Sequence, residues 1–179
     1  YPNYEEIKKY TGVLKPRNFE IFKKRLEEAG MIDQAYDFMM ASGKWSALLY
    51  RADIEMNLRT PEWGGFQLLD LQDYPGQGSA LVGILDAFMD SKGIVAPETF
   101  YGFCAPLVPL ALMKDHCWLN TQPLHIDVAL SNYVEGDWNE PVRWSLVSDN
   151  GVWKRDGVLM ASIPQGKVGK AVLIFHFPD

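Results

Sequence analysis

Residues 63–73 of this chain read Trp63-Gly64-Gly65-Phe66-Gln67-Leu68-Leu69-Asp70-Leu71-Gln72-Asp73. The apolar run from Phe66 to Leu71 is nearly continuous, which favours a strand covered on both faces, as in a parallel sheet. Ligands of such sheets bind just beyond the carboxyl ends of the strands, where this run gives way to acids and an amide. The helical half of the chain contains no second strand of this kind. Because one parallel strand cannot satisfy its own backbone groups, we expect its partners to come from elsewhere and interpret the chain as a piece of a larger enzyme.

The N-terminus fits this interpretation. The chain begins with Tyr1 rather than Met, and its first residues have neither the charged nor the apolar region of a signal peptide. We therefore expect the start to be an artificial boundary or a cleavage point, with removal of a signal peptide as a further alternative.

Composition excludes several classes of function. A net charge of −6 argues against nucleic acid as a partner, and no apolar run approaches the roughly 20 residues of a membrane span. The three histidines are scattered without ligand spacing, so we expect no metal site. Cys104 and Cys117 are too few for a disulfide framework, and we expect buried free thiols, with a bridge between them as the alternative.

The first 62 residues show apolar positions at helical spacing. We expect helices over residues 19–29, 33–41 and 46–58. Asn18 is a plausible N-cap of the first, Ser42-Gly43 should stop the second, and Pro61 forbids continuation of the third. The strand over 65–71 follows, and residues 79–90 are expected to form a helix or an irregular packed segment. Helix, strand and helix in this order are typical of an α/β barrel.

From about Phe103 onward the pattern changes to short strands separated by turns. We expect strands over residues 124–131, 142–146, 158–163 and 170–177. The inward face should carry Leu124, Ile126, Val128, Leu130, Trp144, Leu173 and Phe175. His125, Asp127, Ala129 and Ser131 should lie on the outward face. Short strands with frequent turn residues indicate an immunoglobulin-like β-sandwich. The expected fold is α+β, with a barrel segment over 1–102 and a sandwich domain over 103–179.

The polar positions after the barrel-like strand are the candidate site. We expect a substrate-binding rim formed by Asp70, Gln72, Asp73, Tyr74 and Gln77. Asp70 and Asp73 do not suit a catalytic pair. Three steps along a strand cover about 10 Å, whereas a retaining glycosidase needs its carboxyls about 5 Å apart. The structural alternative is that both acids bond backbone or arginine groups. The glutamates of the helical region, Glu5 and Glu6 included, are expected on solvated faces.

Several blocks resemble one family. They are Arg59-Thr60-Pro61, the block 65–78, Leu85-Asp86-Ala87-Phe88 and Ser91-Lys92-Gly93. Together they resemble the C-terminal part of bacterial glycoside hydrolases related to family 2, which include β-galactosidases, β-glucuronidases and sugar-binding hydrolases. The resemblance covers nearly the whole chain, and its most specific part is the block 65–78. It implies a (β/α)₈ barrel that carries catalysis, flanked by sandwich domains.

The resemblance also implies a function. Residues 65–71 look like the eighth barrel strand, although Leu and Asp replace the tryptophans that line the sugar site of β-galactosidases. The catalytic glutamates of the family lie on the fourth and seventh strands, so no residue here matches them. The implied parent is a retaining exo-glycosidase, periplasmic or secreted, without an organic cofactor. Its partners would be a carbohydrate substrate and the rest of the barrel. From the unpaired strand itself, we expect this chain either to pair with a second copy or to cover the strand with segments that would lie elsewhere in the intact enzyme.

Two other functions stay open at this point. The chain could be a non-catalytic carbohydrate-binding module, with sugar stacked on exposed Trp118, Trp138 or Trp153. It could also be a structural domain that braces a barrel.

Overall fold

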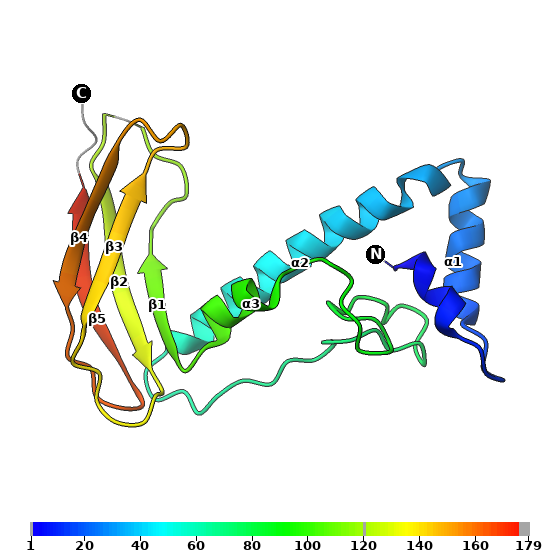
Figure 1. Cartoon of the computed structure of the whole chain (residues 1–179), viewed down its shortest axis with the longest axis horizontal. Helices are drawn as coiled ribbons and strands as arrows, with labels where there is room; N and C mark the ends of the chain where they lie inside the picture. The colour runs from blue at the N-terminus through cyan, green and yellow to red at the C-terminus, as the bar shows by residue number, and fades with distance from the viewer. Residues whose placement is uncertain (1, 120, 176–179) are drawn as a thin grey trace. The chain divides into compact units, whose positions relative to one another are not determined.

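The structure is a computed structural model, which describes residues 2–119 and 121–175. It is a mixed α+β fold (Figure 1). The helices are η1 (Tyr4–Lys9), α1 (Arg17–Glu28), η2 (Ile32–Gln34), α2 (Ala35–Leu58) and α3 (Pro97–Cys104). The strands are β1 (Leu107–Leu112), β2 (Leu124–Asn132), β3 (Pro141–Val147), β4 (Lys154–Met160) and β5 (Lys167–Phe175). The chain forms two compact units, one of Tyr1–Asp53 with Phe66–Tyr101 and the other of Ile54–Gly65 with Gly102–Asp179.

The first helix forms where its apolar stripe predicts. Phe19 and Leu26 are buried on one face of α1, and Gly30 follows the helix with a φ of 68°, a conformation that favours glycine. The predicted N-cap is wrong, since Pro16 holds that position. Asn18 lies inside the helix, and its side-chain oxygen accepts a bond from the backbone of Phe19.

The second and third predicted helices are one continuous helix, α2, so the predicted stop at Ser42-Gly43 is wrong. The Ser42 hydroxyl donates to the Phe38 carbonyl at 2.7 Å, a bond within the helix that does not interrupt it. Gly43 serves close packing, because a Cβ there would lie 2.6 Å from the Ile94 side chain. The predicted end before Pro61 is confirmed.

Residues 66–92 are irregular. The predicted strand over 65–71 is wrong for the chain by itself, since only isolated bridges join Gln72 to Leu85 and Leu85 to Ser91. Residues 64–70 form no backbone–backbone hydrogen bond with any residue that the structure describes. Over 79–90, the alternative of an irregular packed segment is confirmed, because Leu81 and Ile84 are buried without a helix.

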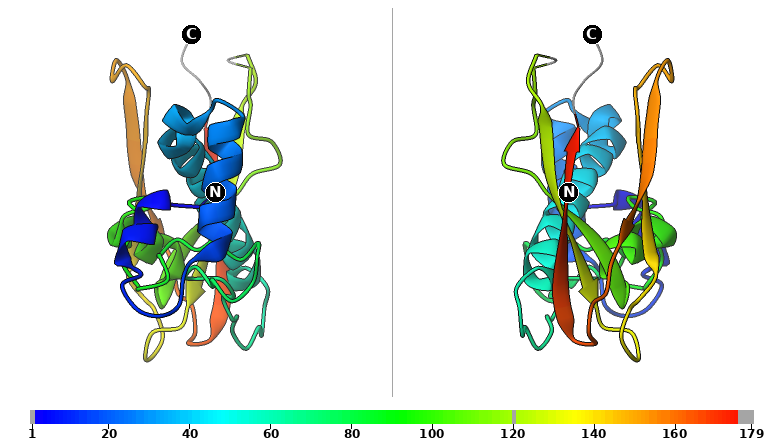
Figure 2. Two further views of the ribbon diagram at one scale, coloured as in Figure 1. Left: turned by 90° about the vertical axis from the view of Figure 1, so that its right-hand side faces the viewer. Right: turned by 90° about the vertical axis from the view of Figure 1, so that its left-hand side faces the viewer.

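The β-rich part contains two small antiparallel sheets, one with strand order β1-β2-β5 and one formed by β3 and β4. Figure 2 shows them as two layers. The strands predicted over 124–131 and 142–146 are confirmed as β2 and β3. The other two predictions are displaced towards the C-terminus relative to β4 and β5, and residues 176–177 lie outside the described part. Neither β1 nor α3 was predicted.

The predicted register of β2 holds in part. Leu124 and Leu130 are buried as expected, but so are Ala129 and Ser131, which were assigned to the outward face. Ala129 lies opposite Leu110 of β1 and packs with it and Val108 in one cluster. Leu58 and Ala105 cover this face, so the end of β2 is buried on both sides. The other predicted core positions, Ile126, Val128 and Trp144, are half-buried. The side chains of Leu173 and Phe175 fall outside the described ones.

Candidate functional site

A buried ion pair lies at the end of the segment with the strongest sequence signal. Lys92 Nζ lies 2.7 Å from Asp73 Oδ1, and the two side chains are 1% and 0% exposed. The backbone N–H of Gly83 donates to the same oxygen at 2.8 Å. A Cβ at Gly83 would lie 2.3 Å from the carbonyl carbon of Gln72, so only glycine permits this approach. The loop therefore wraps tightly around the Asp73 carboxylate.

Glu6 of η1 is also fully buried, which makes its predicted place on a solvated face wrong. Its Oε1 accepts one bond from the Tyr10 hydroxyl and one from the backbone N–H of Ala87, each at 3.2 Å. The Tyr10 ring lies 4.9 Å from the Phe88 ring, edge to face. Nothing in the local pattern around Glu6 signals this burial, because its partner Ala87 is 81 positions away in the sequence.

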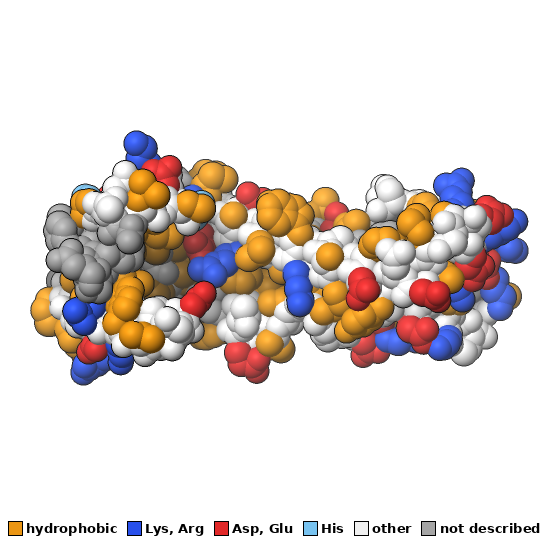
Figure 3. Space-filling view, turned by 90° about the horizontal axis from the view of Figure 1, so that it is seen from above, with side chains coloured by type: hydrophobic (Ala, Val, Ile, Leu, Met, Phe, Trp, Pro, Cys, Tyr) orange, Lys and Arg blue, Asp and Glu red, His pale blue; other side chains and the backbone are white. Residues whose placement is uncertain are grey.

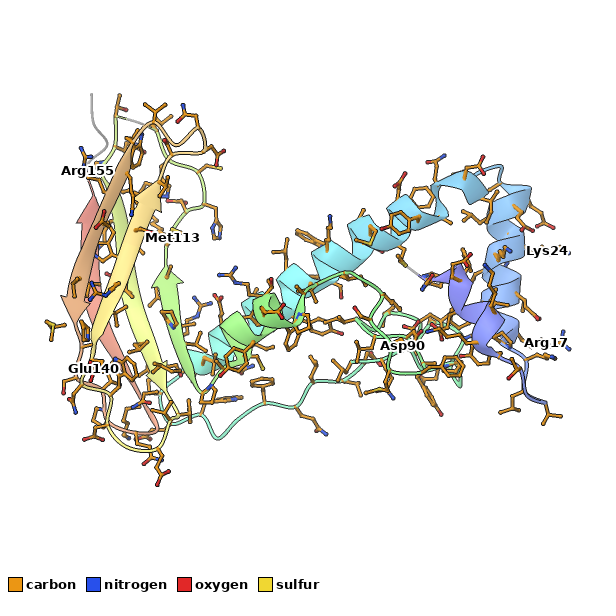
Figure 4. All side chains as sticks on the ribbon, in the orientation of Figure 1. Arg17, Lys24, Asp90, Met113, Glu140 and Arg155 are labelled. Atoms are coloured by element: carbon orange, nitrogen blue, oxygen red, sulfur yellow. The ribbon has the colours of Figure 1, made fainter. Side chains whose placement is uncertain are left out.

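Asp86 joins this network from the loop. Its Oδ1 accepts bonds from the backbone N–H groups of Phe88 and Asp90, at 2.8 and 3.0 Å. Lys9 Nζ bonds its Oδ2 and also lies 2.6 Å from Asp90 Oδ2. Asp90 is labelled in Figure 4, on the loop that faces η1. We call this group the acid cluster: Glu6, Lys9, Asp73, Asp86 and Lys92. Of its members, only Asp73 was a predicted site residue, and the sequence did not predict that the five lie together.

The pKa values of two acids in the acid cluster shift in opposite directions. Burial raises the pKa of Glu6 to about 7, and the charges of Asp73 and Asp86 add to the shift. Burial would also raise the pKa of Asp86, but the hydrogen bond from Lys9 and two backbone bonds hold it below its ordinary value. Glu6 Oε2 and Asp73 Oδ2 are buried, and neither finds a hydrogen-bond partner among the described atoms. A protonated Glu6 can donate to the Asp73 carboxylate, which satisfies both oxygens.

The predicted rim residues do not converge. Asp73 points inward to Lys92, while Gln72 is exposed and only its backbone bridges to Leu85. Tyr74 is 58% exposed, and Gln77 is exposed.

Asp70, the remaining predicted rim residue, has a different role. It is half-buried and has a φ of 62°, which turns the chain away from an extended path. Its backbone carbonyl accepts a bond of 3.4 Å from the Tyr50 hydroxyl. The chain thus turns at Asp70, which places Asp70 and Asp73 in separate environments.

A cavity of about 210 Å³ lies in the same unit. Its lining includes Asn3 and Glu5 of the η1 region, Asp33 and Tyr36, with Met39 as its buried apolar wall. No residue of the acid cluster lines this cavity.

Cys104 and Cys117 are both free. The prediction of free thiols is confirmed, but only Cys104 is partly buried, and Cys117 is exposed. Among the described residues, no group of three or more His, Cys, Asp or Glu side chains is placed to hold a metal ion.

No family model and no curated protein matches this chain. Within 2–119 and 121–175, none of the helices is both long and apolar enough to span a membrane.

Proposed function

We propose that this chain is the C-terminal part of a retaining exo-glycosidase that acts on glycans or oligosaccharides. In this proposal residues 65–71 form a strand of a (β/α)₈ barrel, and residues 103–179 form a flanking immunoglobulin-like sandwich. The observation that carries it is the state of residues 66–71. They have the apolar run expected of a barrel strand, yet Phe66, Leu69 and Leu71 are exposed. Residues 66–70 form no backbone–backbone hydrogen bond with any described residue.

The exposure is large for such apolar side chains. Leu69 is 80% exposed, and Phe66 and Leu71 are about 40% exposed. Each buried apolar side chain of this size stabilises a fold by about 1.5–3 kcal/mol, so leaving them in solvent forgoes that contribution. A barrel provides two neighbouring strands and a covering layer of helices, which together bury both faces of a strand.

Helix α2 supports the same proposal. Trp45, Leu48 and Leu49 are exposed by 63%, 56% and 48%, and their spacing of three and four places them on one side of the helix. Figure 3 shows hydrophobic side chains on the surface of the molecule in many places. Exposed apolar side chains gathered on one side of a helix are typical of an interface, and the remaining helices and strands of a barrel are the partner that suits them.

In this proposal the predicted rim residues have either a structural or a sugar-contacting role. Asp73 holds the loop through Lys92 and does not touch substrate, whereas Gln72, Tyr74 and Gln77 have side chains free to reach a sugar. The two glutamates of a double displacement would come from the preceding part of the parent enzyme. This reaction needs no organic cofactor.

The carbohydrate-binding alternative finds less support. Trp118, Trp138 and Trp153 are all half-buried, and the Trp138 Nε1–H donates to the Glu140 carbonyl. None of them is a flat, open platform for a sugar ring.

The test compares this chain with the polypeptide extended upstream through the predicted barrel. Both are assayed on aryl galactosides, glucuronides and mannosides. We expect hydrolysis by the extended form, background rates for the chain alone, and loss of hydrolysis in the extended Leu69→Lys variant. Met160→Lys, at a position 74% exposed in the β-rich unit, is the control and should retain activity.

Two results would overturn the proposal. One is an extended form that folds but hydrolyses none of the glycosides. The other is saturable sugar binding by the chain alone, which would favour the binding module.

A further inference from the structure

The acid cluster holds more acids than bases. Glu6, Asp73 and Asp86 are buried, and Asp90 faces them from the surface, whereas the cations are Lys9 and Lys92. Lys9 is engaged by Asp86 and Asp90, and Lys92 by Asp73. Glu6 is therefore the acid that has no cation of its own.

The geometry around Glu6 favours its neutral form. Its Oε1 has two donors, Tyr10 and Ala87, but its Oε2 has none. Asp73 Oδ2 also has no donor, because Lys92 and the backbone N–H of Gly83 both donate to Oδ1. Two buried oxygens without donors cost free energy if both are charged, and a single proton between them removes that cost.

Every element packed against Glu6 contributes to this environment. From η1 come Lys9 and Tyr10, and from the turn at residue 73 comes Asp73. The loop contributes Asp86, Asp90 and Lys92, and α1 contributes the apolar ring of Phe19, 6.2 Å from the Tyr10 ring. Both cations in this set are already paired with aspartates.

We propose that Glu6 carries a proton that it donates in a hydrogen bond to Asp73, and that this proton locks the segment Asn3–Tyr10 onto the loop formed by residues 72–92. When the proton leaves, two like charges face each other in a buried site, and Glu6 withdraws from the loop. Lys9 stays paired with Asp86 and Asp90, so the segment loosens at Glu6 and does not detach as a whole. The lock is thus closed in mildly acidic solution, half open near neutral pH and open in mildly alkaline solution.

The direction follows from proton linkage. The pKa of Glu6 in the folded chain is raised to about 7 from an ordinary value of 4.5. The folded state therefore binds more protons than the unfolded state between these two values, and stability falls as pH rises through that window. Asp86 acts in a different window, because its pKa is lowered and its contribution is lost only in strong acid.

The experiment uses the full chain and two readouts. Carbon-13 NMR of labelled glutamate side chains follows the Glu6 carboxyl, which we expect to titrate near pH 7. Amide hydrogen exchange, corrected for its intrinsic pH dependence, follows the N–H of Ala87. We expect its protection to fall at least tenfold between about pH 5.5 and about pH 8.5.

Substitution distinguishes the effect of the Glu6 proton on the protection of Ala87 from the effect of ordinary packing. Glu6→Gln keeps the shape of the side chain and carries a permanent N–H donor toward Asp73, so it should hold Ala87 protected at both pH values. Glu5→Gln is the matched control, since Glu5 is an exposed neighbour paired with Lys8, and it should behave as the unmodified chain does.

Three results would overturn the proposal. They are titration of Glu6 near its ordinary value of 4.5, equal protection of Ala87 at both pH values, and a Glu6→Gln variant that still loses protection in alkaline solution. If Glu6→Gln fails to fold, the NMR titration of the unmodified chain decides alone.

Discussion

Residues 66–71 and strand β2 both have the apolar content of a strand, but only β2 forms one. β2 pairs with β1 on one side and β5 on the other, and Leu58 and Ala105 cover one of its faces. Residues 66–70 have no backbone–backbone bond to any described residue, and the Leu71 carbonyl accepts a single backbone bond, from Leu85. The comparison shows that an apolar pattern tells how many faces a strand can bury, whereas the availability of partners decides whether it forms.

The two regions are also held together differently. The β-rich unit has an apolar cluster around Leu110 and Ala129, while the loop at 72–92 is organised by buried charges. Substitutions in each region can test this contrast.

The largest effect is expected at the buried ion pair. Lys92→Met leaves the Asp73 carboxylate buried without its cation, which typically destabilises a protein by about 3–5 kcal/mol. Urea unfolding measures the loss. Lys24→Met, at a side chain 75% exposed, is the control and should change stability by less than about 0.5 kcal/mol. The double variant Asp73→Leu/Lys92→Met should recover much of the loss, and no recovery would mean that charge burial is not the cause.

Next comes the apolar cluster. Leu110 is 1% exposed, and Leu110→Ala should cost about 2–5 kcal/mol by lost burial and cavity formation. Leu119→Ala, at a position 63% exposed in the same unit, should be close to neutral. Equal stability of the two variants in thermal or urea unfolding would contradict the assigned core.

A smaller effect is expected at Gly83. A Cβ there would meet the backbone of Gln72 and Asp73 at 2.3–2.5 Å, so Gly83→Ala should destabilise by about 1–3 kcal/mol. Gly78→Ala has open space around the new Cβ and provides the comparison. If both alanines have the same midpoint of denaturation, the loop does not pack against Asp73 as described.

The smallest effect on stability is expected at Leu69. Because this side chain is 80% exposed, Leu69→Lys should change the free energy of unfolding by less than about 0.5 kcal/mol. The same change should weaken self-association in light scattering, because an exposed apolar edge invites pairing with another chain. Unchanged association would show that the chain does not self-associate through Leu69.

Much of the β-rich part follows from the sequence because its signal is local. Alternation predicts β2 and β3, and turn residues separate them. β1 contains Pro109, which argues against a strand, and is stabilised by its pairing with β2. The burial of Ala129 depends on β1 and on Leu58, which no pattern within β2 reveals.

The candidate site was less predictable. Asp73 was predicted as a site residue because it follows the apolar run, but its partner Lys92 lies 19 residues away in the sequence. Glu6 contacts Ala87, which is 81 residues away. Ion pairs and hydrogen bonds at such separations leave no periodic signal. At Ser42-Gly43, residues typical of a helix end lie inside α2 because Gly43 packs against Ile94. Tertiary contacts therefore decided both the site and the course of α2.

The central claim is that residues 66–71 form a strand only when a partner sheet is supplied. Site-resolved amide exchange tests it most directly, on the chain alone and on the polypeptide extended upstream through the predicted barrel. We predict rapid exchange at 66–70 in the chain alone and slow exchange at 66–70 in the extended form. The N–H of Asp73, which donates to the Leu85 carbonyl, and the N–H of Leu85, which donates to the Leu71 carbonyl, serve as protected references. Rapid exchange at 66–70 in both forms, or slow exchange in the chain alone, would contradict the claim.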